Sequence, residues 1–497
     1  MAEVVQARAD HVASRAIRPA RPWVSGPPVQ WLAVCVGSAA LGWVIAWIGA
    51  TLGPIAMVAV PVCVIAAIAI FAVPRVGIMA VYASFPLGFV EVPTYPLSLK
   101  LVELVILVAA TLIAIRRLAD GRTPLRWAHQ LGWALALLAW TVIATPSALD
   151  LTLALKQVFL LGGGLLLAAA VLTACTTLAD VRSVVRVLLL VGGGMALYGL
   201  RNVSAMRAAY SGAAVQGRAD SVFADPNHFG AFAAVILIVA VGLTLGSRTR
   251  SDRVLGILVS IASLAGLMMS LSRGAWLGTV AAGCALLYLL PQARRALLYI
   301  GVPVVITAAL FGAFRPTSPE VVILRERLGT VSALAGPTRY RYDERPAIWA
   351  EALREIRLDA WTGQGPGNFV IASATAASLA STVGAEHAHD VLLTVAAEAG
   401  LPAAAILVAL TVSLGLTVLR IVRRTADAGD RALVAGIGCA LVVQLGQGIV
   451  DFNFRNAVVS SLMWSLVGLV LVADRQVRRR ARTDGSPEVV SAAGELG

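Results

Sequence analysis

Long apolar segments recur along almost the whole chain, and they constrain its fold more than any other feature. The 497 residues are 59% hydrophobic and only 13% charged, whereas a soluble domain is typically about 45–50% apolar and about 25% charged. A helix needs about 20 mostly apolar residues to cross a bilayer, and segments of this kind follow one another from residue 31 to residue 473. The sequence therefore predicts an all-α polytopic membrane protein.

The segments predict about 12 to 14 membrane-spanning helices. The expected spans are residues 31–50, 54–73, 76–90, 99–115, 130–148, 151–174, 184–200, 228–246, 254–270, 275–290, 296–314, 401–419, 432–450 and 457–473. The third is short, and the first two could form a hairpin that does not fully cross. The chain then divides into an N-terminal tail (1–29), helices 1–11 (30–314), a long and partly helical loop (315–390), helices 12–14 (391–474) and a C-terminal tail (475–497).

Basic clusters between the apolar segments indicate how the chain is threaded. The formal net charge is +13, and cytoplasmic loops of membrane proteins are enriched in basic residues. With fourteen spans and both termini inside, every arginine cluster falls on one side; twelve spans would preserve this agreement. Because these basic residues lie between apolar segments, they indicate the orientation of the helices in the membrane. We therefore expect no nucleic-acid partner.

Polar residues gather on the opposite, outer side. Charge at a membrane-embedded position is costly, so it is a functional hypothesis by default. The candidates are Glu103, Lys156, Arg218, Asp225, Asn227, His228, Arg273, Glu386, His387, His389, Asp390, Gln447, Asp451 and Asn453. Each one alone is more often a plain interfacial residue, but together with the long loop they predict an outward-facing polar cavity.

Histidines and arginines in one outer site favour a specific chemistry. Arginine forks pair with phosphate oxygens, and a histidine can accept a proton from a hydroxyl. Together they suit transfer from a phosphate-activated donor to a hydroxyl. The pair His387 and His389 alone is more often a surface pair or an adventitious metal ligand, and zinc would need further ligands. Only Glu386 and Asp390 are close enough in sequence, so we expect no metal and no cofactor.

Several motifs in a fixed order carry a family resemblance. They are ADPNHFGAF (Ala224–Phe232), LSRGAWLG (Leu271–Gly278), ERPAIWAEALREI (Glu344–Ile356), GQGPGNF (Gly363–Phe369) and HAHDVLLTVAAEAGLP (His387–Pro402). In this order they resemble the O-antigen ligase and polymerase superfamily of bacterial envelope glycosyltransferases, which includes O-oligosaccharyltransferases. The resemblance covers about Gly217 to Pro402.

The resemblance implies a GT-C-like enzyme of the bacterial cytoplasmic (inner) membrane, with its active site facing the periplasm. The donor would be a glycan on undecaprenyl diphosphate and the acceptor a glycolipid or glycan, such as the lipid A core, within membrane lipid. Arg273 and Arg345 match the family's arginines and would stabilise the diphosphate as leaving group. His389 matches the histidine of the final motif and would act as general base on the acceptor hydroxyl, or position it. The transfer would be metal-independent and inverting.

Other residues complete the expected site. Asp390 stands where the family usually has Asn, and its carboxylate could raise the pKa of His389 or orient its ring. His387 leaves open which imidazole acts, and Arg339 and Arg341 compete with Arg345 for its role. Substrate-binding roles are expected for Arg218, Asn227, His387, Arg341, Asp390 and Glu398.

Other functions remain open at the level of sequence. A polysaccharide polymerase and a protein O-oligosaccharyltransferase would use the same chemistry on a different acceptor. A transporter or flippase belongs to another class, and transporters often show paired halves with interrupted helices near the bilayer midplane. The sequence has no internal repeat of this kind, and its charges cluster at the outer face, which favours an enzyme.

Overall fold

The computed structural model describes residues 54–94, 97–201, 207–208, 215–216, 218–291, 293–294, 345–375 and 387–483. The chain divides into two compact units, residues 1–68 and 69–497. Helix α3 (Pro54–Ala72) begins in the first unit and ends in the second. Every residue of the site described below belongs to the second unit.

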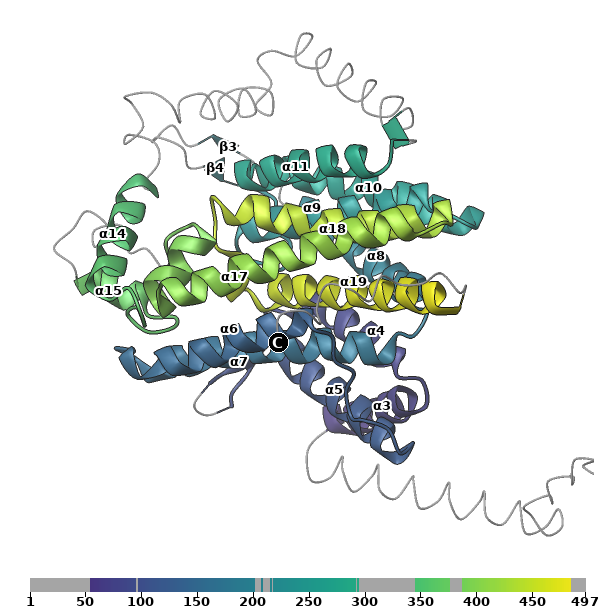
Figure 1. Ribbon diagram of the computed structural model, residues 1–497, viewed down its shortest axis with the longest axis horizontal. Helices are drawn as coiled ribbons and strands as arrows, with labels where there is room; N and C mark the ends of the chain where they lie inside the picture. The colour runs from purple at the N-terminus through teal and green to yellow at the C-terminus, as the bar shows by residue number, and fades with distance from the viewer. Residues whose placement is uncertain are drawn as a thin grey trace, which may run out of the picture. The chain divides into compact units, whose positions relative to one another are not determined.

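Helices form most of the described part of the second unit (Figure 1). They are α4 (Arg75–Ala83), α5 (Leu101–Ala119), α6 (Gln130–Ala144), α7 (Leu151–Ala174), α8 (Leu178–Gly199), α9 (Pro226–Leu245), α10 (Arg250–Ser270), α11 (Arg273–Leu289), α14 (Arg345–Leu358), α15 (Phe369–Thr375), α17 (Val391–Arg424), α18 (Ala428–Gly448) and α19 (Ala457–Thr483). Short 3-10 turns are η1 (Phe85–Leu87), η2 (Thr145–Ser147) and η6 (Asn453–Arg455). Two small antiparallel ribbons pair β1 (Glu91–Val92) with β2 (Leu99–Lys100), and β3 (Arg207–Ala208) with β4 (Val215–Gln216).

Eight of the described helices are long and apolar enough to cross a membrane. They are Gln130–Ser147, Leu151–Ala174, Leu178–Gly199, Pro226–Leu245, Arg250–Ser270, Val391–Arg424, Ala428–Gly448 and Ala457–Arg480. This confirms the predicted all-α polytopic fold. The expected spans at 31–50 and 296–314 lie outside the described residues, so the total of 12 to 14 stays a prediction.

The helices at the expected spans 54–73, 99–115 and 275–290 are not among these eight, and two further expected spans are interrupted or displaced. Residues 76–90 do not form one continuous helix, because α4 ends at Ala83 and η1 follows. Pro86 lacks the N–H that would continue the α-helical hydrogen bonds, which accounts for the interruption. The span expected to begin at Leu401 is the second part of α17, whose helix is broken at Gly400 (φ 81°, ψ 168°).

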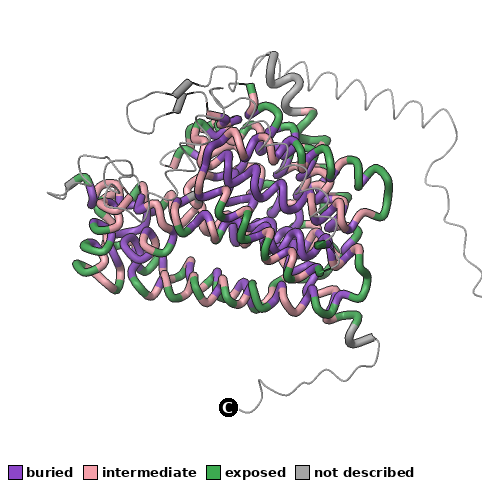
Figure 2. The backbone as a smooth tube through the Cα atoms, turned by 90° about the horizontal axis from the view of Figure 1, so that it is seen from above, coloured by how far each residue is buried: buried purple, intermediate pink, exposed green. Residues whose placement is uncertain are grey.

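Helix α18 lies at the centre of the second unit. It packs against α9, α11, α17 and α19, which run beside it (Figure 1). Buried segments fill the middle of the bundle, whereas the outer helices carry exposed positions (Figure 2). Large apolar side chains such as Leu258 and Leu416 are among the exposed ones, as expected for helix faces that contact lipid.

One end of the bundle holds basic residues in ion pairs, and we call it the basic end. Arg182 Nη2 lies 3.4 Å from Asp430 Oδ1, and Arg248 Nη2 lies 2.9 Å from the same carboxylate oxygen. Arg186 Nε lies 2.6 Å from Asp252 Oδ1. Arg182, Arg186 and Arg248, which the predicted topology places on one side of the membrane, therefore lie at one end of the bundle. The opposite end, where α9, α11 and α17 begin, is the site end; which side of a membrane it faces stays a prediction.

The loop helices α14 and α15 pack against the first part of α17. Apolar side chains from these elements form a small core of their own, made by Ile348, Ala352, Phe369, Ala388 and Ala397. Just beyond this core, the Leu401 N–H donates to the Ala360 carbonyl at 2.8 Å. The described part of the long loop is thus attached to α17 at its break.

Replacing Gly400 by alanine is expected to destabilise this attachment. A Cβ at Gly400 would lie 1.8 Å from the Trp361 carbonyl oxygen, and its φ of 81° is unfavourable for alanine. Strain of this kind costs on the order of 1–3 kcal/mol, so the unfolding midpoint in detergent should fall by a few degrees. Gly415→Ala is the matched control, because nothing lies within 4 Å of a Cβ there. Equal midpoints for the two variants would contradict this prediction.

Candidate active site

A polar cavity of about 400 Å³ lies at the site end of the bundle. Its lining residues are Arg218, Asn227, Leu271, Ser272, Arg273, Gly274, Arg345, Val450 and Asp451. The cavity brings together Arg273 and Arg345, the predicted diphosphate-binding pair, although about 70 residues separate them in sequence. Two of the predicted substrate-binding residues, Arg218 and Asn227, line the same cavity.

Arg273 is positioned by the tight turn between α10 and α11. Leu271 ends α10 in the left-handed region (φ 53°), and the Ser272 hydroxyl accepts the Ala275 N–H at 3.4 Å as the cap of α11. Arg273 is therefore the first residue of α11. A helix N-terminus carries partial positive charge from its unpaired N–H groups, which adds to the charge of the guanidinium.

Close packing of α11 on α18 brings Arg273 near Asp451. A Cβ at Gly278 would lie 2.6 Å from the Val443 carbonyl oxygen, and one at Gly446 would lie 2.9 Å from the Gly278 Cα. Small residues at this interface let two helix backbones approach. The glycines of the Leu271–Gly278 motif therefore have a packing role, while its arginine faces the cavity.

Arg218 is held by two hydrogen bonds from its guanidinium. Its Nε donates to the Ser270 carbonyl at 2.8 Å, and its Nη2 donates to Asn227 Oδ1 at 3.0 Å. Asn227 lies in the first turn of α9, where the Asp225 side chain accepts its N–H at 2.7 Å. Gln447 on α18 donates to the Asn227 carbonyl at 3.1 Å. These contacts fix Arg218 and Asn227 relative to α10 and α18.

Arg345 reaches the cavity from α14, of which it is the first described residue. The apolar face of that helix is anchored in the loop core through Ile348 and Ala352. The loop therefore contributes one arginine to a cavity whose other walls belong to the helical bundle. Three arginines and one carboxylate, Asp451, give the cavity a net positive lining.

His389 and Asp451 form a hydrogen-bonded pair beside the cavity. His389 Nδ1 lies 3.1 Å from Asp451 Oδ1. Burial alone would raise the pKa of Asp451, but the His389 hydrogen bond and electrostatic interactions with the two histidines and Arg345 lower it to about 2. The carboxylate therefore stays ionised and can hold the proton of His389 on Nδ1, which leaves Nε2 to accept another.

His387 has a different environment. Its Nδ1 accepts the His389 backbone N–H at 3.2 Å, and its ring packs edge-on against those of His389 and Phe452. Burial, followed by the neighbouring His389, lowers the pKa of His387 to about 3. Since His387 stays neutral and its Nδ1 is occupied, the geometry favours His389 as the proton acceptor.

Some non-glycine residues in the left-handed backbone region belong to this site. Among the described residues, that region contains Ser98, Ser221, Ala224, Leu271 and His389. Leu271 lines the cavity, and Ala224 directly precedes the cap of α9. Strained backbone tends to persist where the surrounding structure holds functional groups in place, and His389 (φ 50°) is the clearest case.

Three of the predicted substrate-binding residues that the structure describes, His387, Asp390 and Glu398, are not in the cavity lining. The Asp390 carboxylate caps α17 by accepting the Leu393 N–H at 2.8 Å, so the carboxylate that contacts the His389 ring is that of Asp451. Glu398 is buried, forms an ion pair with Arg455 and accepts the Gly367 N–H at 2.9 Å. Its described contacts hold the GQGPGNF loop. Arg341, like Arg339 and Glu386, lies outside the described residues.

Asp451 is the functional candidate that sequence reasoning did not select. It was one of several polar residues near outer helix ends, and no motif distinguishes it. Its partner His389 lies 62 residues away, so only the packing of α18 beside α17 reveals the pair. The sequence does contain a weak signal for Asp451. An acidic residue between two apolar helices is costly to bury and therefore needs a partner.

One family model matches a part of the chain. Residues 257–408 match the model of the O-antigen ligase family. This segment, which is less than half of the chain, resembles an O-antigen ligase domain, and we use that term for residues 257–408 alone. The domain contains Arg273, Arg345 and His389, whereas Arg218 and Asp451 lie outside the matched segment. The site is therefore completed by residues before and after the O-antigen ligase domain.

Other comparisons are more distant. No curated protein matches the chain. A solved structure described as "Structural coordination of polymerization and crosslinking by a peptidoglycan synthase complex" aligns with 70% of this chain and 97% of its own chain. Its sequence identity is 18% and its TM-score 0.40. The assignment of the O-antigen ligase domain rests on the family match alone.

One buried acid in the O-antigen ligase domain predicts a pH-dependent stability. Burial, and then the charge of Glu351, raise the pKa of Glu355 from 4.5 to about 8. Because the folded state favours the protonated acid, its contribution to stability is full below pH 4.5 and is lost as the pH rises through 8. Glu355→Gln should raise the unfolding midpoint by a few degrees at pH 9 and barely change it at pH 4. A difference independent of pH would contradict this prediction.

Proposed function

We propose that this protein is a membrane glycosyltransferase of the ligase type, which transfers a glycan from undecaprenyl diphosphate to an acceptor hydroxyl on the extracytoplasmic side. The observation that carries the proposal is the meeting of Arg218, Arg273 and Arg345 in one cavity beside the His389–Asp451 pair. The family match to an O-antigen ligase domain supports the same chemistry.

The arginines would bind the diphosphate of the donor. Planar guanidinium groups match phosphate oxygens bidentately and stay charged at all physiological pH values. The N-termini of α9 and α11 point partial positive charge toward the same region. Charge that develops on the diphosphate as the glycosidic bond breaks would be stabilised by groups already in place.

His389 would act as general base on the acceptor hydroxyl. Its Nε2 accepts the hydroxyl proton while the hydroxyl oxygen bonds to the anomeric carbon of the donor sugar. The bond from that carbon to the diphosphate oxygen breaks, and its electron pair leaves with undecaprenyl diphosphate. A single displacement of this kind inverts the anomeric configuration. Asp451 would keep the ring oriented and stabilise the imidazolium that forms.

A metal ion is the alternative use of the same side chains. Ligand atoms of His387, His389 and Asp451 all lie within 4.8 Å of one another. Hydrogen bonds already engage Nδ1 of both histidines, since His389 Nδ1 contacts Asp451 and His387 Nδ1 accepts a backbone N–H. We expect transfer to be unchanged by a chelator; loss of transfer that zinc restores would assign the trio to a metal.

A complementation experiment tests the proposed function. Cells that depend on this protein should lose the surface glycan when they carry His389→Ala, and undecaprenyl-linked glycan should accumulate on the extracytoplasmic face. A flippase would instead trap the lipid-linked glycan on the cytoplasmic face. Short surface chains with one repeat would indicate a polymerase, and loss of glycan from proteins alone would indicate protein O-glycosylation.

A further inference from the structure

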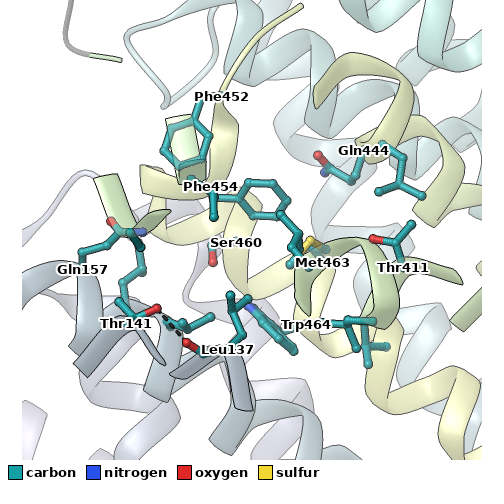
Figure 3. Close-up of a pocket in the computed structure, with 18 of the residues that line it drawn as sticks. Leu137, Thr141, Gln157, Thr411, Gln444, Phe452, Phe454, Ser460, Met463 and Trp464 are labelled. Carbon is teal, nitrogen blue, oxygen red and sulfur yellow. Dashed lines mark hydrogen bonds between the residues drawn. The ribbon is translucent and has the colours of Figure 1, made fainter. Parts of the chain in front are cut away.

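Positive charge outside the polar cavity is distributed unevenly. Figure 3 shows a cavity of about 1060 Å³ within the bundle, with Phe452, Met463 and Trp464 in its wall, and its described lining contains no arginine or lysine. At the basic end, by contrast, arginines from α5, from the loop that follows it and from α19 act on one another electrostatically. An anionic ligand is therefore favoured at the basic end.

Five of these arginines form what we call the arginine cluster. They are Arg117, Arg122, Arg126, Arg475 and Arg479. Burial, followed by the charges of Arg117, Arg479 and Arg122, lowers the pKa of Arg126 below its usual range. Arg117, Arg126 and Arg479 also interact electrostatically with Arg475. Because these like charges repel one another, an anion bound among them would lower the electrostatic energy.

The centre of the cluster, Arg126 and Arg475, has no acidic partner in the part of the chain that the structure describes. Asp474 directly precedes Arg475, but its Oδ2 lies 2.8 Å from Arg478 Nε, outside the cluster. Nη1 of Arg126 and Nε of Arg475 are buried and lack a hydrogen-bond partner among the described residues. Unsatisfied buried donors are unfavourable, so the centre of the cluster lacks acceptor atoms as well as negative charge.

Hydrogen bonds to the end of α7 hold this centre in place. Arg475 Nη1 donates to the Leu172 carbonyl at 2.8 Å, and its Nη2 donates to the Cys175 carbonyl at 2.6 Å. The Arg126 backbone N–H donates to Thr173 Oγ1 at 2.7 Å. The end of α7 thus fixes arginines from two distant parts of the chain, α19 and the loop before α6. Groups that are already fixed lose less conformational entropy when they bind a ligand.

The surroundings of the cluster favour a lipid over a soluble anion. Leu118 and Trp127, each adjacent in sequence to an arginine of the cluster, are both exposed. Tryptophan is enriched where membrane helices meet the head groups of the bilayer. Arg122 and Arg479 are exposed as well and form the accessible edge of the cluster. A phospholipid offers a phosphate to these arginines and acyl chains to the neighbouring apolar side chains.

We propose that the arginine cluster binds the phosphate head group of an anionic phospholipid, whose acyl chains lie against Leu118 and Trp127. This proposal concerns the basic end and is independent of the function proposed for the site end. Guanidinium groups bind phosphate oxygens through paired hydrogen bonds. Basic pockets between membrane-spanning helices on the cytoplasmic side are suited to anionic head groups, and the predicted topology places the basic end on that side.

A competition experiment on the full chain tests the ligand. A phosphatidylglycerol with a fluorescent label in one acyl chain is bound to the protein in detergent micelles and then displaced by unlabelled lipids. We expect phosphatidylglycerol to displace it at a concentration at least tenfold lower than phosphatidylcholine with the same acyl chains. Equal displacement would overturn the proposal, because binding would then not depend on the charge of the head group. Displacement by millimolar inorganic phosphate would overturn it too, by assigning the cluster to a soluble anion.

Two triple variants that each remove three positive charges test the location. The cluster variant keeps Arg126 and Arg475, with their hydrogen bonds to α7, and combines Arg117→Gln, Arg122→Gln and Arg479→Gln. The control changes exposed arginines elsewhere at the basic end and combines Arg250→Gln, Arg253→Gln and Arg424→Gln. We expect the cluster variant to bind phosphatidylglycerol at least tenfold more weakly and the control less than twofold more weakly. Equal losses would contradict the proposal, since they would reflect net charge alone. The lipid competition on the unmodified chain decides the matter if the cluster variant does not fold.

Discussion

His389→Ala is expected to lower the rate of glycan transfer by about 10²- to 10⁴-fold, the usual range for loss of a general base. His389 Nδ1 lies 3.1 Å from the ionised carboxylate of Asp451, so its Nε2 remains to accept the proton of the acceptor hydroxyl. Initial rates at saturating donor, measured on purified protein, give this value directly. The loss should appear in kcat, because the variant keeps the groups assigned to binding.

His387→Asn is the control for this variant. An asparagine side chain can still accept the His389 backbone N–H, which His387 Nδ1 accepts at 3.2 Å, so the rate should fall by less than about tenfold. Asp451→Asn keeps the shape of the carboxylate but removes its charge. We expect it to lower kcat with little change in the KM of the donor, and Asp451→Glu to restore part of the rate. A larger loss for His387→Asn than for His389→Ala would reverse the assignment of the base.

Arg273→Ala and Arg345→Ala are each expected to lower transfer by about 10²- to 10³-fold, or about 2.7–4 kcal/mol, as for other groups that stabilise developing charge. Both guanidinium groups line the cavity in which we place the diphosphate. Lysine at either position should recover only part of the rate, since it keeps the charge but not the planar fork. The measurement is kcat/KM for the donor together with the affinity for undecaprenyl diphosphate.

Arg354→Ala is the matched control for the arginine variants. Arg354 lies on the same helix as Arg345, but its side chain is 45% exposed and pairs with Glu351. Its removal should leave transfer unchanged. If Arg354→Ala were as damaging as Arg345→Ala, the loss would reflect the stability of α14 rather than contact with the donor.

The sequence predicted those parts of the molecule that depend on local pattern. Apolar stretches located the spanning helices because each must satisfy its own backbone in lipid. The ordered motifs selected Arg273 and Arg345, which the fold brings into one cavity. One exception is residues 76–90, where Pro86 interrupts a stretch whose hydropathy alone resembles a span.

Side-chain partners that lie on different helices could not be predicted from local sequence patterns. Asp390 is the nearest carboxylate to His389 in sequence, yet its position makes it a helix cap. The pairing carboxylate is Asp451, which follows the end of α18. Glu398 stands in a motif with His389 but pairs with Arg455. These partners depend on how α17, α18 and α19 pack, which hydropathy does not encode.

The most direct test of the central claim is a reconstituted transfer reaction. Purified protein in liposomes receives a synthetic undecaprenyl-diphosphate-linked glycan and a lipid acceptor fraction from cells that carry the surface glycan. We predict free undecaprenyl diphosphate and glycosylated acceptor in equal amounts, with both lost in His389→Ala. If the glycan instead stayed on its carrier while the carrier crossed the bilayer, the protein would be a transporter and the account would be wrong.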